Sequence, residues 1–183
     1  MTWNRHWRMV ATLAGLSLAA LWLYLYTGRL DRQREDDSPQ PDLTIIQPRL
    51  TTFNLQGQVR SQLYAERLEQ WPHEDGARLT EPRLTLHDRM QRRWLATAHR
   101  GRTRSGDRSL LLEDRVVLKR EPDHHGLVIK TGKLHIAQNG DTIETDDAVV
   151  LTSGSWHFTA MGLRTRLDRQ RLELLNKVRG KHE

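Results

Sequence analysis

Apolar and polar residues alternate over most of the chain after residue 42. Trp94, Ala96 and Ala98 share one parity, and after an intervening turn Leu110 and Leu112 resume the same alternation. A period of two is typical of β-strands that bury one face. The pattern therefore predicts antiparallel strands from residue 43 to the end. It predicts no long amphipathic helix there, because "RSQLYAERLEQW" also fits the strand pattern.

The alternation recurs as a repeated unit. Copies begin at residues 61, 94, 127 and 156, and the pentapeptides "QPRLT" (47–51) and "EPRLT" (81–85) mark the same position in a truncated first copy and the next one. The clearer copies each contain two alternating runs around a turn signal: "RSGDR", "AQNGD" or "RLDRQR". Stacked hairpins bury their apolar faces only against neighbours. We therefore expect two antiparallel sheets facing each other in an elongated all-β sandwich or jelly roll.

When the copies of the repeat are aligned, two columns of equivalent positions break the alternation. The parity slips near Gly101, Leu134 and Leu163, which predicts a β-bulge that bends the strand. A polar column, Asp114, Asp147 and Asn176, falls on the apolar parity. Paired catalytic carboxylates are one interpretation. We favour a bend or a sheet edge, because Asp and Asn tolerate unusual backbone angles.

The start of the chain has a different pattern. Residues 9–28 contain no charge, and their length as a helix is about 30 Å, the thickness of a bilayer's hydrocarbon core. A cleaved signal peptide would need small residues after the apolar run, whereas this run ends in "LWLYLYTG". We expect a short head (1–8), an uncleaved transmembrane helix (9–28), a polar linker (29–42) and a β domain (43–183). The flanking Lys and Arg residues do not decide the orientation.

Small residues recur every four positions in this predicted span. Ala11, Gly15 and Ala19 would share one face of the helix and let a partner transmembrane helix approach closely. The alternative is that Ala and Gly are simply common in such spans.

Composition and charge exclude several classes of function. The net charge of +6 is spread over interleaved acids and bases, which indicates a soluble surface rather than a nucleic-acid face. The absence of Cys excludes disulfides, Cys-based zinc sites and a Cys nucleophile. No phosphate-binding Gly loop occurs, and "TSGSW" lacks the Gly-x-Ser-x-Gly elbow. We interpret His124-His125 as a solvated turn rather than a metal site. The sequence thus predicts no enzyme, no metal and no cofactor.

The inward positions of the repeats are Leu, Ile, Val and Ala. These side chains either pack together as an ordinary core or leave a slot that holds an alkyl chain. The segments "FNLQGQVRSQLYAERLEQWP", "LTEPRLTLHD", "LLLEDRVVL", "IETDDAVVLTSG" and "LELLNKVRG", in this order behind a single span, resemble the LptC family of lipopolysaccharide export proteins. The resemblance implies a twisted β jelly roll in the periplasm, shared with the bridge protein LptA. It also implies a single-pass anchor in the cell inner membrane with a cytoplasmic N-terminus.

The resemblance further implies partners and a role in outer-membrane biogenesis. Lipopolysaccharide would pass from the ABC transporter (LptB, LptF and LptG) through the jelly roll to LptA, and this chain would hydrolyse nothing. A different class of function is a membrane-anchored scaffold or regulator with a closed β core and no lipid.

The resemblance assigns residues to these roles. The positions that would line the lipid slot are Leu63, Leu79, Leu112, Ile143 and Leu172. The final strand, with Leu172, Leu174 and Val178, would be the edge to which a partner adds its own strand. Gly57 and Gly154 match turn glycines. The chain departs from the family in its outward Arg102, Arg104, Arg164 and Arg166, which we interpret as a solvated face rather than as lipid phosphate ligands.

Overall fold

The computed structural model describes residues 40–88, 90, 92–106, 109–121, 126–137, 140, 142–167 and 171–182. The predicted transmembrane helix, with Ala11, Gly15 and Ala19, lies outside the described residues, as does the His124-His125 pair. Residues 40–183 form a compact unit of their own. Within the described ranges, no helix has the length and hydropathy that a membrane span requires.

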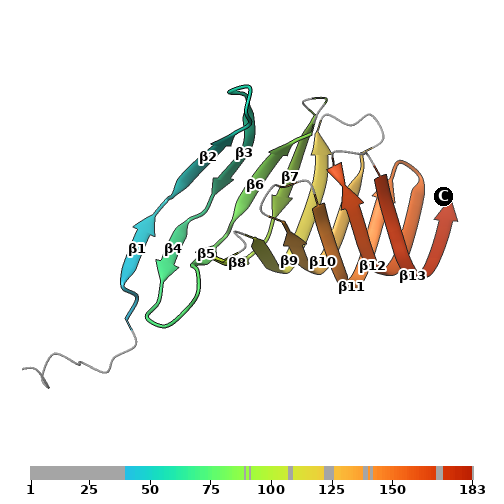
Figure 1. The fold of residues 1–183 in the computed structure, drawn as a ribbon. Helices are drawn as coiled ribbons and strands as arrows, with labels where there is room; N and C mark the ends of the chain where they lie inside the picture. Colours follow the sequence, from blue (N-terminus) through green and yellow to red (C-terminus); the bar gives the residue numbers. More distant parts are fainter. Residues whose placement is uncertain are drawn as a thin grey trace, which may run out of the picture. The chain divides into compact units, whose positions relative to one another are not determined.

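The described residues form thirteen antiparallel strands joined in one sheet (Figure 1). The strands are β1 (Leu43–Ile46), β2 (Arg49–Phe53), β3 (Val59–Tyr64), β4 (Arg67–Gln70), β5 (Arg78–Thr80), β6 (Arg83–His87), β7 (Arg93–Thr97), β8 (Arg100–Thr103), β9 (Leu110–Glu121), β10 (Val128–Ile136), β11 (Thr142–Ser153), β12 (Trp156–Arg166) and β13 (Arg171–His182). From β5 to β12, buried side chains alternate with more exposed ones, as the pattern predicted, whereas the edge strands β1, β2 and β13 are mostly exposed.

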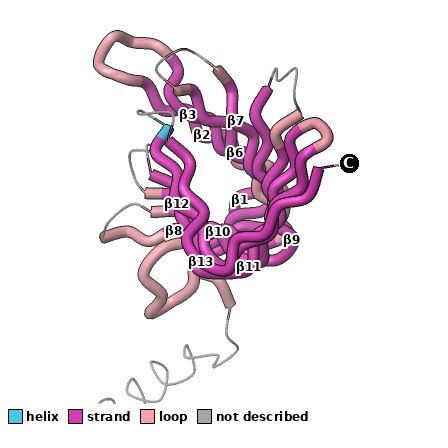
Figure 2. Tube along the Cα trace, turned by 90° about the vertical axis from the view of Figure 1, so that its right-hand side faces the viewer, coloured by secondary structure: helices cyan, strands magenta, loops and turns pink. Residues whose placement is uncertain are grey.

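The sheet divides into two halves at β9. The first part of β9 pairs with β8 and its last part pairs with β7, while its other side pairs with β10. One half continues through β8, β5, β4 and β1, and the other through β7, β6, β3 and β2. In the view of Figure 2 the strands curve round a common interior. The two expected facing layers are therefore halves of one continuous bent sheet, which corrects the prediction of two separate sheets.

The bends fall where residues adopt left-handed backbone angles. Gln47 (φ 52°) and Glu81 (φ 50°) open the two repeated pentapeptides, and a proline follows each of them. Proline has no N–H to donate to the strand ladder, so the strands break into β1 and β2, and into β5 and β6. Asp114 has φ 66° in the polar column, which confirms the interpretation of that column as a bend at this position.

Bulges account for the parity slips of the C-terminal hairpins. The register shifts between Thr131 and Lys133 in the β9–β10 pair and between Thr159 and Met161 in the β12–β13 pair. A third shift lies between Thr145 and Ala148 in the β11–β12 pair, next to Asp147. These shifts confirm the predicted bulges before Leu134 and Leu163. Near Gly101 the strand is interrupted instead, between β7 and β8.

Candidate functional site

The inward side chains form apolar rows that run across the whole sheet. In the first row each residue pairs directly with the next across neighbouring strands from β2 to β13. Its members are Leu50, Leu63, Leu84, Ala96, Leu118, Ile129, Leu151, Phe158 and Gly180. Gly180 leaves space for the ring of Phe158, because a Cβ at that position would lie 2.9 Å from Cε1 of Phe158.

A second row follows the other half of the sheet from β1 to β10. Its members are Ile45, Leu68, Leu79, Gly101, Leu112 and Leu134. Beyond β10, Thr145, Leu163 and Leu174 pair across β11, β12 and β13. The first row therefore connects the edge strand β2 with the edge strand β13, and the second row connects the edge strand β1 with β10.

Burial changes along these rows. In the middle of the sheet Leu118 and Ile129 are each 1% exposed, whereas Leu50 on β2 is 59% exposed and Ile45 on β1 is 41% exposed. On β13, Leu172 and Leu174 are half-buried and pack against the core. The interior is thus closed in its centre and opens towards both edge strands.

The five predicted lining residues lie in this one interior. Leu79, Leu112 and Ile143 are buried in the core, and the half-buried Leu63 and Leu172 pack against it. Their contact with lipid stays a prediction. Leu172, Leu174 and the exposed Val178 lie on the edge strand β13. Gly57 (φ 75°) and Gly154 (φ 57°) lie in the turns that follow β2 and β11.

The opposite edge of the sheet was not predicted from the sequence. Strands β1 and β2 and the turn after them expose large apolar side chains at Leu43, Ile45, Ile46, Leu50, Phe53 and Leu55. The signal was present in the sequence, because Ile45 and Ile46 are adjacent and so place apolar side chains on both faces of one strand. An apolar strand at an open edge is typical of a surface that another chain covers.

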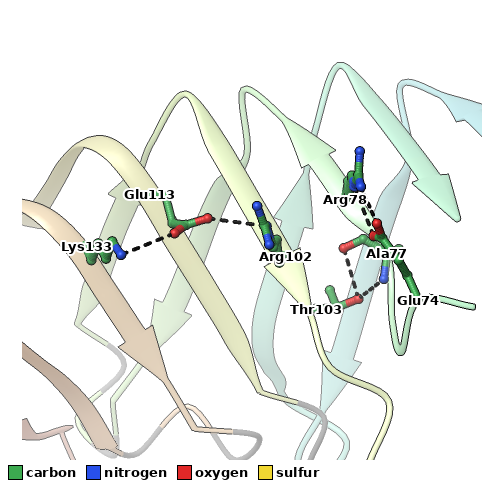
Figure 3. Close-up of polar contacts among 7 residues, drawn as sticks. All are labelled: Glu74, Ala77, Arg78, Arg102, Thr103, Glu113 and Lys133. Atoms are coloured by element: carbon green, nitrogen blue, oxygen red, sulfur yellow. Dashed lines mark hydrogen bonds and ion pairs between the residues drawn. The ribbon is translucent and has the colours of Figure 1, made fainter. Parts of the chain in front are cut away.

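The outward face of the sheet carries charged side chains that pair with one another (Figure 3). Nε of Arg102 lies 3.4 Å from Oε2 of Glu113, and Nζ of Lys133 lies 3.7 Å from Oε1 of the same carboxylate. On a neighbouring strand pair, Nε of Arg164 donates to Oε2 of Glu144 at 3.2 Å. These contacts between strands favour the solvated-face interpretation of Arg102 and Arg164.

The loop between β4 and β5 is held against the end of β8. Nε of Arg78 donates to Oε2 of Glu74 at 2.9 Å, and this hydrogen bond lowers the pKa of Glu74 and raises the pKa of Arg78. The backbone N–H of Ala77 donates to Oγ1 of Thr103 at 2.9 Å (Figure 3). Gly76 approaches so closely that a Cβ there would lie 1.8 Å from the carbonyl oxygen of Thr103. Among the described residues, no three acidic or His side chains are placed to hold a metal ion.

The fold and its interior define a class of protein: an open, all-β jelly roll with an apolar interior that reaches both ends of one bent sheet. A protein-family model described as "Lipopolysaccharide-assembly, LptC-related" matches residues 9–183. The chain belongs to the LptC family, a family of periplasm-facing transport components, and its role is in lipopolysaccharide transport. No curated protein matches the chain closely.

Proposed function

We propose that this chain relays lipopolysaccharide from the inner-membrane ABC transporter to LptA, with the acyl chains held between the two halves of the bent sheet. The observation that carries the proposal is the continuity of the first inward row from β2 to β13, beside the second row that begins at β1. Apolar surface buried against acyl chains stabilises a complex roughly in proportion to its area. A relay needs such a surface to be open at two ends, and the half-exposed edge rows provide that opening.

The two edges suit different partners in this proposal. The exposed apolar strands β1 and β2 receive the periplasmic part of the transporter formed by LptF and LptG with the ATPase LptB. The last strand, β13, adds a strand of LptA through backbone hydrogen bonds, as open sheet edges can do. Lipopolysaccharide then moves along the rows in the direction of the chain.

Residues 9–28 anchor the protein in the inner membrane with the β domain in the periplasm. The face with Ala11, Gly15 and Ala19 packs on the transmembrane helices of the transporter. A Gly15→Leu chain is expected to be recovered with less transporter after mild detergent extraction, because its added side chain separates the helices. Leu18→Ile is the matched control in the same span. Recovery of the full complex with Gly15→Leu would contradict this docking face.

One observation favours the scaffold as a second candidate function. The centre of the interior is tightly closed, with Leu112 and Ile143 at 0% exposure. At the rim, a Cβ on Gly140 would lie 2.9 Å from Cδ2 of Leu86, so the turn after β10 approaches β6 closely. A scaffold would keep this interior closed, whereas a relay would separate the halves whenever lipid enters.

Site-specific photo-crosslinking in cells tests the relay. A photoreactive side chain replaces Leu63, whose side chain lies in the first inward row, or Gln62, the exposed outward neighbour on the same strand. We expect lipopolysaccharide adducts at 63 and none at 62, and we expect the adducts to need an ATP-hydrolysing transporter. No adduct at 63 in a folded, transporter-bound chain would favour the scaffold.

A further inference from the structure

The two outer faces of the bent sheet differ in charge. The residues directly before and after each member of the first inward row have the opposite parity, so their side chains point away from the interior. We call these residues the basic face, and register pairs join them across neighbouring strands from β2 to β13. The face lies wholly within the described ranges and contains no Asp or Glu. Its Lys and Arg residues are Arg49, Arg83, Lys119, Lys130, Arg179 and Lys181.

The other outer face carries both signs of charge. It consists of the residues directly before and after each member of the second row and of Thr145, Leu163 and Leu174. Its acids are Glu69, Glu113, Glu144, Asp146 and Glu173. Three of these acids pair with Lys or Arg side chains of the same face. Acids and bases interleave along the chain, but the fold separates them: Glu113 and Lys119 share strand β9 and lie on different outer faces.

The six Lys and Arg side chains of the basic face are exposed and have no counter-charge beside them. Within the part of the chain that the structure describes, none of them makes a side-chain hydrogen bond or an ion pair. Glu121 lies just beyond the face and is paired with Arg93 at 3.6 Å. Unpaired like charges on one surface create a positive potential that attracts an anionic partner.

The arrangement of these charges indicates the kind of partner. Arg49 and Arg179 are eight strand steps apart, which corresponds to roughly 40 Å along the sheet. Charges spread in this way suit an extended anionic surface rather than one small anion. Tyr64 is the only Phe, Trp or Tyr of the face, so it lacks the aromatic anchors typical of a specific protein interface. A second copy of the chain has no matching acidic face to offer, because its other outer face mixes acids with bases.

We propose that the basic face lies on the anionic headgroups of the membrane that anchors the chain, before the chain binds its transporter. The inference rests on the proposed function, because it needs residues 9–28 in the membrane. Residues 29–42 would then hold the β domain within about 50 Å of the bilayer, the greatest length that fourteen residues can span. In this position both edge strands remain open to their partners.

Fluorescence quenching on the full chain in lipid vesicles tests the contact. The chain has no Cys, so a single Val117→Cys or Leu111→Cys substitution carries one fluorophore. Both residues are half-buried, outward-facing positions of β9, but Val117 belongs to the basic face and Leu111 to the other outer face. Lipids with a nitroxide on the headgroup quench only a fluorophore that lies against them. The vesicles contain phosphatidylcholine with or without phosphatidylglycerol.

We expect strong quenching at position 117 and weak quenching at position 111 in vesicles with phosphatidylglycerol at 0.1 M salt. The difference should disappear in pure phosphatidylcholine. It should also disappear at 1 M salt, because the screening length falls from about 10 Å to about 3 Å.

Neutral variants test which face makes the contact. In the chain labelled at 117, Arg83→Gln with Lys130→Gln should lower the ratio of membrane-bound to free β domain about 10-fold or more. The matched control is Arg67→Gln with Arg100→Gln, which makes the same change in net charge on the other outer face. This control should keep most of the quenching at 117.

The contrary outcomes are distinct. Equal quenching at 111 and 117, or quenching that ignores lipid charge and salt, would overturn the basic face as the contact. Absence of quenching at 117 in a chain that floats with the vesicles would overturn the membrane contact and favour an acidic protein partner. A chain that does not float with phosphatidylcholine vesicles would instead contradict the anchor of the proposed function.

Discussion

Single residues decide where this chain bends. A left-handed backbone angle costs a residue other than Gly roughly 1–2 kcal/mol, so each occurrence needs support from its surroundings. At Glu81 the support is visible: its N–H donates to the carbonyl of His99 at 2.9 Å, and its carboxylate lies 2.9 Å from Nδ1 of His99. Asp114 could be predicted as a bend because Asp is common at such angles. Glu81 and Lys177 could not, because only the finished sheet holds them there.

Asp88 gives a prediction at the same scale. Its nearly buried carboxylate accepts from two backbone N–H groups and from Arg92. Asp88→Ala leaves these donors without their acceptor, and we expect a loss of about 3 kcal/mol in the free energy of unfolding, measured by urea denaturation. The control is Glu121→Ala, which removes an exposed partner of Arg93 and should cost less than about 1 kcal/mol. An equal loss of unfolding free energy in the two variants would contradict the expectation that the buried contacts of Asp88 are the more stabilising ones.

At the scale of the strands, the sequence pattern predicts the hairpins but not how all of the strands pair. The hairpins β7–β9, β10–β11 and β12–β13 match the three clear copies of the repeat, because alternation and turn residues are local signals. Two features were not predictable in this way. The first is that β9 pairs with β8 along its first part and with β7 along its last part. Alternation and turn residues do not specify which part of a strand pairs with which neighbour. The exposed edge at β1 and β2 depends on the order of strands in the sheet, which a repeat does not specify.

The first inward row offers a matched series of leucines at the level of the strands. Leu118→Ala, at 1% exposure, should lower the free energy of unfolding by about 2–5 kcal/mol, because a cavity forms in a packed core. Leu50→Ala, on the edge strand, should change it by only about 0.5 kcal/mol. Leu63→Ala should fall between them. Urea denaturation of the three chains measures the gradient, and a cost at Leu50 equal to that at Leu118 would show that the edge is buried in solution.

For the whole β domain, the two ends of the sheet are chemically different. The β1–β2 edge exposes large apolar side chains, whereas β13 places Leu172 and Leu174 against the core and exposes Leu175 and Val178. The first edge is therefore suited to a long-lived interface that buries apolar side chains. The second edge is suited to backbone pairing with a partner that binds and dissociates. In the proposed relay, this asymmetry would set a direction that the repeated units alone do not supply.

Hydrogen exchange on the full chain in nanodiscs tests that direction. Amides in β9, β10 and β11 should exchange slowest, because their strands are paired on both sides and cover the packed core. Amides of β1, β2 and β13 should exchange faster, since each of these strands has a neighbour on one side only. Adding LptA should slow exchange in β13 and leave β1 and β2 unchanged, while the assembled transporter should do the reverse. Protection of β1 and β2 alone by LptA would reverse the assignment of the edges, whereas slower exchange in both edges with LptA alone would contradict an LptA site confined to β13.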